Sequence, residues 1–119
     1  MDTQILERGV DRILVVDANR GELSTESYFY RLFTTCQEER LDKVLLNYPS
    51  LPPGFFNPHT GRAEEVLRRF TQANIKIALI ASIEMLQNDR IETILGLSLR
   101  YKFHVAYTQQ QAEQWLINE

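Results

Sequence analysis

A nearly unbroken apolar run, Ile-Lys-Ile-Ala-Leu-Ile-Ala at residues 75–81, restricts the fold of this chain more than any other feature. Runs of this kind are typical of strands that are buried on both faces of a sheet. Such a sheet needs helices on both faces, and its parallel strands are joined by helical crossovers. The run therefore predicts an α/β fold in which residues 75–81 form a central strand.

Four further apolar runs predict the other strands. Residues 3–7 and 12–17 flank a short polar connection, which is typical of an antiparallel hairpin. Residues 44–46 predict a short buried strand, and residues 103–107 predict a strand in which apolar side chains alternate with smaller or polar ones. We expect His104, in this last strand, to face solvent or a neighbouring side chain.

The first two helices are predicted from apolar side chains at helical spacing. The first spans about residues 24–40, because Ser24 is a good N-cap and Leu23 lies at the hydrophobic-staple spacing from Tyr28. The second begins with Asn57 as its cap and Pro58 in its first turn. Their expected inward-facing stripes are Phe29, Leu32, Phe33 and Cys36 in the first helix, and Ala63, Val66, Leu67 and Phe70 in the second.

The pattern that predicts the third helix is weaker than the pattern that predicts the fourth. The third starts near Asn88 and is weakened in its later part by Gly96. The fourth follows Thr108, which stands at capping-box spacing from Gln111. The apolar residues that recur at helical spacing are Ile91, Ile94 and Leu95 in the third helix, and Ala112, Trp115 and Leu116 in the fourth.

The resulting order ββαβαβαβα predicts a single α/β domain over residues 1–119. It contains a mostly parallel sheet of about five strands, opened by a hairpin, and about four helices. With 119 residues the chain is too short for two independent cores, which excludes a two-domain enzyme. No linker, repeat or low-complexity segment divides it.

The composition argues against several classes of partner. Thirteen basic residues against sixteen acidic ones give a formal charge of −3, so no broad basic field is expected to attract nucleic acid. No apolar segment approaches the roughly 20 residues that a membrane span needs, and we expect a cytoplasmic protein that does not bind membranes. The single cysteine, Cys36, cannot form an internal disulfide and is expected to act as a small buried hydrophobe.

Catalytic motifs are not found in the sequence. It contains no Gly-rich phosphate loop, no HExxH, no CxxC and no GxSxG. No histidine or cysteine stands near His59 at metal-ligand spacing. We therefore expect a non-enzymatic protein without a metal or other cofactor.

The segment Phe-Phe-Asn-Pro-His-Thr-Gly-Arg-Ala-Glu-Glu-Val-Leu at residues 55–67 carries a family resemblance. It resembles an uncharacterised bacterial family of small stand-alone domains of unknown function, which is similar in element order to STAS domains of the anti-sigma-factor antagonist type. Those domains carry Phe-x-Asp-Ser-Ser-Gly-Leu where a strand leads into a helix, and a partner kinase phosphorylates a serine there. The resemblance places Thr60-Gly61 at the Ser-Gly position, whereas Pro58 and His59 replace the aspartate and Arg62 replaces the leucine.

The resemblance makes Thr60 a candidate phospho-acceptor, although a plain helix-start threonine is the simpler interpretation. If Asn57 caps the helix, His59 and Thr60 lie in its first turn, where free N–H groups and the helix dipole favour an anion. Asn57, His59, Gly61 and Arg62 are then candidate partner-binding or anion-binding residues. Arg62, Arg68 and Arg69 are otherwise expected to form a solvated helix face.

Two consecutive phenylalanines, Phe55 and Phe56, lie in a loop rich in proline and glycine. They must either fill the core or face a partner, and both alternatives are open. Asp17, at the end of the second strand, is a further polar position where a site can form.

Three functions are compatible with these features. The leading hypothesis is a regulatory module that binds a protein partner, such as a kinase or an anti-sigma-like protein, through residues 49–58 and the start of the second helix. The second is a receptor for a small molecule or anion that uses His59, Thr60 and Arg62. The third is a structural homodimer.

Overall fold

The computed structural model describes residues 2–17, 26–87 and 91–118. Within them, a five-stranded sheet has the spatial order β1-β2-β3-β4-β5, so that strands adjacent in sequence are also adjacent in space. The strands are β1 (Asp2–Arg8), β2 (Asp11–Asp17), β3 (Lys43–Asn47), β4 (Lys76–Ile80) and β5 (Phe103–Ala106). β1 and β2 form an antiparallel hairpin, and all other pairs are parallel. The mixed α/β fold and the order ββαβαβαβα are confirmed.

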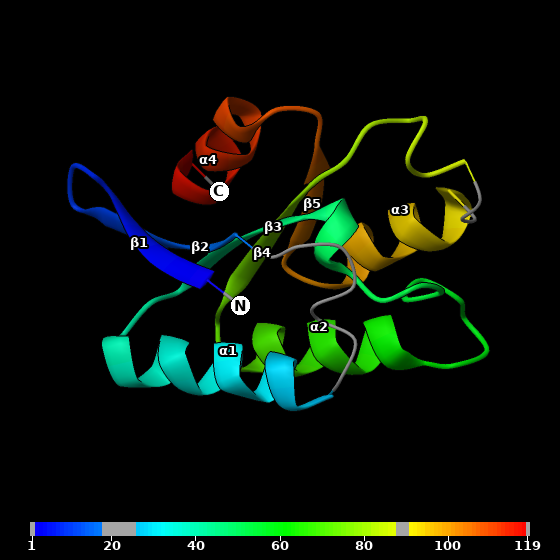
Figure 1. Ribbon diagram of the computed structural model, residues 1–119, viewed down its shortest axis with the longest axis horizontal. Coiled ribbons are helices and arrows are strands. Elements are labelled where there is room, and N and C mark those ends of the chain that lie inside the picture. The colour runs from blue at the N-terminus through cyan, green and yellow to red at the C-terminus, as the bar shows by residue number, and fades with distance from the viewer. Residues whose placement is uncertain (1, 18–25, 88–90, 119) are drawn as a thin grey trace.

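The helices cover both faces of this sheet (Figure 1). They are α1 (Glu26–Glu39), α2 (Arg62–Gln72), α3 (Ile91–Arg100) and α4 (Gln109–Asn118), with a short 3-10 turn η1 (Tyr48–Ser50) after β3. α1 and α2 lie side by side on one side of the sheet, and α4 lies on the other. In the described part of the chain no helix is long and apolar enough to cross a membrane.

The strand pleat divides the core between the two faces. Val44 and Leu46 in β3 belong to the cluster that packs against α1, α2 and α3, whereas Leu45 between them belongs to the cluster under α4. Ile77 and Ala78 in β4 divide in the same way. This double burial explains the unbroken apolar run at residues 75–81. β4 is an interior strand as predicted, although β3 occupies the middle position.

The predicted stripe of α1 is confirmed, since Phe29, Leu32 and Cys36 are buried. The helix ends at Glu39, and the next residue, Arg40, is left-handed with a φ of 56°; the Leu41 N–H donates to the Cys36 carbonyl at 2.7 Å. This closing bond is the one expected of a helix end with a left-handed residue. The expected cap and staple at residues 23 and 24 lie outside the described residues.

The apolar pattern predicted for α3 and the cap predicted for α4 can both be compared with the structure. Of the three apolar residues that recur at helical spacing in α3, Ile94 is buried together with Leu97, whereas Ile91 and Leu95 are exposed. Helical spacing shows which residues share a face but does not show which face packs inward. For α4 the cap is confirmed, because the Gln111 N–H donates to Thr108 Oγ1 at 3.1 Å.

Candidate functional site

The loop between β3 and α2 begins at the carboxyl end of β3, the edge of an α/β sheet where sites commonly form. Its two phenylalanines are in the core: Phe55 is 6% exposed and Phe56 3%. The Phe55 ring stacks on Phe29 with centroids 5.4 Å apart, and the Phe56 centroid lies 6.1 Å from that of Phe103. Of the two alternatives, core filling therefore holds. The assignment of both rings to a partner-binding surface is corrected, because neither is available for contact.

The residues just before these rings are also tied down. Ser50 is fully buried, and its hydroxyl donates to the Asn47 carbonyl at 2.7 Å. Leu51 is buried in the same core cluster as Phe55 and Phe56. The loop is therefore anchored at Ser50, Leu51, Phe55 and Phe56, because burying these side chains holds the backbone at those points against the core.

Residues 57–61 form an exposed turn directly after the buried rings, and we call it the Thr60 turn. The Thr60 N–H donates to the Asn57 carbonyl at 3.2 Å. The His59 N–H donates to Asn57 Oδ1 at 3.0 Å, which makes an Asx turn. Asn57 thus caps a turn and not a helix. The prediction that it starts the second helix, with Pro58 in the first turn, is wrong by several residues.

The second helix begins at Arg62, after Gly61 in the left-handed region with φ 66°. A glycine adopts this conformation without the steric cost that a side chain adds. Gly61 stands at the N-cap position but has no side chain to cap the helix, so Thr60, one residue earlier, supplies the cap. Its hydroxyl accepts the Arg62 N–H at 3.3 Å and donates to the Asn57 carbonyl at 2.9 Å. The threonine therefore joins the turn to the helix.

The first turn of α2 is acidic. It contains Glu64 and Glu65. Glu64 Oε1 accepts hydrogen bonds from Arg100 at 3.1 Å and from the Tyr101 hydroxyl at 2.8 Å. The expectation that His59 and Thr60 lie within this turn as anion donors is corrected: they precede it, and two carboxylates follow them. Like charges there disfavour a bound anion.

The predicted solvated face of α2 is confirmed in two of its three arginines. Arg68 and Arg69 are exposed, and Arg69 lies 3.9 Å from Glu65 in an i,i+4 ion pair. Arg62 is half-buried at the start of the helix. Exposed ion pairs of this kind contribute little to stability, so these arginines are not needed to hold the fold together.

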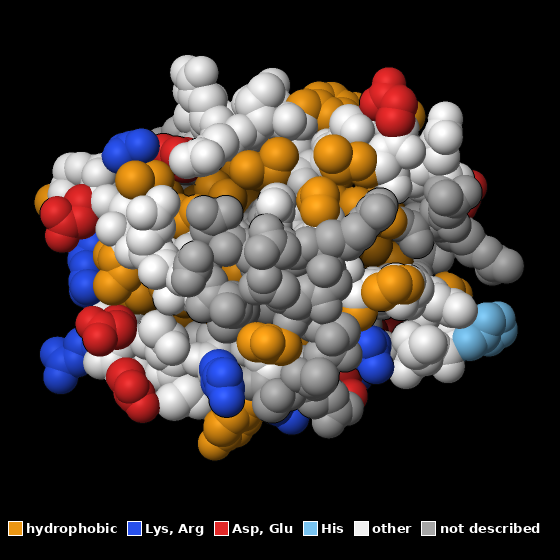
Figure 2. Space-filling model, in the orientation of Figure 1, with side chains coloured by type: hydrophobic (Ala, Val, Ile, Leu, Met, Phe, Trp, Pro, Cys, Tyr) orange, Lys and Arg blue, Asp and Glu red, His pale blue; other side chains and the backbone are white. Residues whose placement is uncertain are grey.

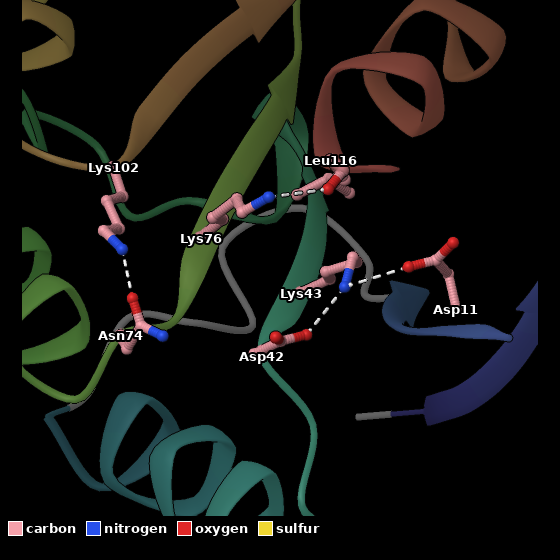
Figure 3. Close-up of polar contacts among 7 residues, drawn as sticks. All are labelled: Asp11, Asp42, Lys43, Asn74, Lys76, Lys102 and Leu116. Carbon is pink, nitrogen blue, oxygen red and sulfur yellow. Dashed lines mark hydrogen bonds and ion pairs between the residues drawn. The ribbon is translucent and has the colours of Figure 1, made fainter. Parts of the chain in front are cut away.

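A second polar region lies at the amino-terminal edge of the sheet, where three lysines start neighbouring strands (Figure 3). Lys43 and Lys76 are register partners in β3 and β4, and Lys102 directly precedes β5. Like charges on adjacent strands repel. Each ammonium group therefore has a separate acceptor: Lys76 donates to the Leu116 carbonyl at 3.0 Å, and Lys102 donates to the Asn74 side chain.

Lys43 is the most buried of the three and contacts two carboxylates. Its Nζ lies 2.8 Å from Asp42 and 3.3 Å from Asp11, the first residue of the neighbouring strand β2 (Figure 3). Burial lowers the pKa of Lys43, but its hydrogen bonds to Asp42 and Asp11 outweigh that effect and leave the pKa raised.

A hollow of about 310 Å³ beside Lys43 is lined by residues 10–12 and 40–43. Charges of both signs line it, from Asp11 and Asp42 on the one hand and Arg12, Arg40 and Lys43 on the other. The sequence analysis missed this arrangement. The available signal was a lysine at or next to the start of three of the five predicted strands, but only the register shows that these lysines are neighbours.

The remaining candidate residues are separate from the Thr60 turn. Burial raises the pKa of the Cys36 thiol to about 12, with a smaller contribution from the Asp42 charge, and the expected inert role fits this burial. His104 stacks on Trp115 with centroids 5.1 Å apart, which confirms that it faces a neighbouring side chain. The Asp17 side chain lies outside the described residues. Asn47 Oδ1, not singled out from sequence, is a buried oxygen without a hydrogen-bond partner among the residues that the structure describes.

Comparison with known proteins identifies a family without a known activity. Residues 8–116 match the family model described as "Domain of unknown function (DUF4180)". No curated protein and no solved structure matches the chain significantly. Among the residues that can be described, no group of three or more side chains is arranged to hold a metal ion. The geometry of the described residues is therefore the basis for a functional proposal.

Proposed function

The chain belongs to the DUF4180 family, and we propose that it is a non-enzymatic, STAS-like regulatory module of the bacterial cytoplasm. Its contact surface is the Thr60 turn together with the start of α2. The partner is a protein, such as a kinase or an anti-sigma-like protein, and phosphorylation of Thr60 controls its binding.

The observation that carries the proposal is the contrast in burial within the β3–α2 loop. Phe55 and Phe56 are almost fully buried, whereas residues 57–61, directly after them, are all exposed. Anchoring in the core holds the exposed turn in one conformation, so a partner orders little backbone when it binds. A rigid polar turn on a packed scaffold is a common form of recognition surface.

Thr60 is suited to control this surface because its hydroxyl connects the turn to the helix. Phosphorylation removes the hydroxyl proton and with it the bond from Thr60 to the Asn57 carbonyl. The new negative charge lies beside the amino terminus of α2, where the helix dipole favours it and Glu64 opposes it. The net change in free energy from these two opposing effects is on the order of 1 kcal/mol. A change of this size alters a binding surface without unfolding the domain.

The resemblance to anti-sigma-factor antagonists supports the same site. Those domains carry a hydroxyl residue before a glycine where a strand leads into a helix, and in this chain Thr60-Gly61 lies in the connection from β3 to α2. Binding of a free anion is not the function that we propose, because Glu64 and Glu65 oppose a negative ligand that no covalent bond holds at the helix start.

The test compares proteins retained by the wild type, Thr60→Ala and Thr60→Glu from a lysate of the native host, with quantitative mass spectrometry of the retained proteins and of the bait. Thr108→Glu is the matched control, since Thr108 is also an exposed threonine that caps a helix. We expect a specific partner to lose binding to Thr60→Glu and to remain bound to the Thr108 variant.

A direct measurement completes the test. The partner is purified, and its dissociation constant is measured against each variant and against wild-type protein phosphorylated at Thr60. A change of at least about tenfold, or 1.4 kcal/mol, at Thr60 alone supports the proposal. If every variant retains the same proteins with equal affinity, the Thr60 turn is not the contact surface.

A further inference from the structure

The outer face of α3 is apolar. Ile91, Leu95 and Leu99 are 48%, 58% and 87% exposed. They follow one another at intervals of four residues and therefore form a stripe along one face of the helix, which we call the α3 stripe. Ile94 and Leu97, on the opposite face, fill the core. The helix is thus apolar on the side that packs and on the side that faces solvent, which is unusual for a surface helix.

The segment leading into α3 extends this apolar surface at its amino-terminal end. Ile83 and Met85 are 57% and 45% exposed. Hydrophobic side chains also reach the surface around α3 in the space-filling view (Figure 2). Each of the five side chains is at least 45% exposed, and exposed apolar side chains that gather on one surface are often found at interaction sites.

Gly96 lies at the middle of this helix, and among the described residues nothing packs closely over the place where a side chain would begin. A Cβ built at this position meets no atom within 4 Å. Glycine is a poorer helix former than alanine, so a glycine here weakens the helix without improving any internal contact. A missing side chain does allow a second helix to approach closely, because the distance between packed helices depends on the side chains at the contact.

The charges along α3 indicate which helix fits. Glu92 lies at its acidic beginning and Arg100 at its basic end, each four residues from Gly96. In an antiparallel copy related by a two-fold axis at Gly96, Glu92 lies against Arg100 of the partner subunit. The symmetry produces this contact twice in one dimer. The two helix dipoles are then antiparallel as well. The surface is therefore complementary to itself.

We propose that α3 is the interface of a homodimer in which the α3 helices of two copies pack antiparallel about Gly96. Arg100 also bonds Glu64 within its own chain, and its five N–H donors allow both contacts. The two apolar patches with their charged rims bury roughly 1,000 Å², the lower limit of a specific interface. Because the interface is at the small end of specific interfaces, we expect the dimer to be in reversible equilibrium with the monomer. This inference does not depend on the function proposed for the Thr60 turn.

Sedimentation equilibrium of the purified full chain tests the proposal. At about 100 μM we expect the wild type to be mainly dimeric, and Leu99→Glu to raise the dissociation constant at least about tenfold. Val10→Glu is the matched control, because Val10 is an aliphatic residue 97% exposed on the β1–β2 turn. It is expected to leave the dimer unchanged. Circular dichroism of each variant shows whether its fold is intact.

A charge exchange tests the antiparallel register. Glu92→Arg and Arg100→Glu are each expected to weaken the dimer, and the double variant, which restores opposite charges across the two-fold axis, is expected to recover it. A wild type that is monomeric at this concentration overturns the proposal. So does a dimer that Leu99→Glu leaves intact, or one that Val10→Glu dissociates equally.

Discussion

Replacing Phe56 with alanine removes one of the two rings that hold the Thr60 turn. The ring is 3% exposed and packs between Phe55 and Phe103. An aromatic side chain buries about 150–250 Å², and about 25 cal/mol for each Å² of apolar surface gives roughly 4–6 kcal/mol for the whole side chain. Alanine keeps part of that surface, so we expect the free energy of unfolding to fall by about 3–4 kcal/mol, within the range known for such changes.

Urea unfolding followed by the fluorescence of Trp115, the single tryptophan, measures this loss. Tyr30→Ala is the control, because Tyr30 lies on α1 with 62% of its surface exposed and its loss is expected to change stability by less than about 0.5 kcal/mol. The slope of the unfolding free energy against urea concentration should be similar in both variants if each unfolds in two states. A loss below about 1 kcal/mol for Phe56→Ala contradicts the conclusion that the ring fills the core.

Three other measurements test individual contacts. Native Cys36 is expected to resist thiol reagents at pH 8 and to react only after unfolding. Because its pKa rises from 9.0 to about 12 on folding, the free energy of unfolding should fall as the pH rises from 9 toward 12, which a series of urea denaturations measures. Lys43→Met leaves Asp42 and Asp11 without their ammonium partner and is expected to cost about 1–2 kcal/mol in urea unfolding, since both carboxylates keep contact with water. The raised pKa of Lys43 means that its contribution is complete below its ordinary pKa of 10.5 and is lost as the pH rises through the higher folded value, so wild type and Lys43→Met should converge in stability at strongly alkaline pH. Thr108→Ala removes the cap of α4 and is expected to lower the unfolding free energy by about 1 kcal/mol, whereas Thr108→Ser should restore most of it.

Sequence and structure disagree most at the start of α2. Asn57-Pro58 satisfies the pattern of a helix cap followed by proline, and it satisfies the pattern of a turn equally well. Local chemistry does not separate the two. The burial of Phe55 and Phe56 fixes the path of the chain just before Asn57, and on that path the Asn57 side chain accepts the His59 N–H and closes a turn. The helix then begins at Arg62.

The alternation of strands and helices, the double burial of residues 75–81, the cap at Thr108 and the burial of Cys36 were determined by the sequence itself. These features depend on side-chain periodicity and on contacts within a few residues, which a linear pattern contains. Tertiary structure alone decided three others: that Phe55 and Phe56 face inward, that the apolar α3 stripe faces outward, and that Lys43 in β3 meets Asp11 in β2. Each of these depends on which distant segments become neighbours, and that is settled only when the whole core packs.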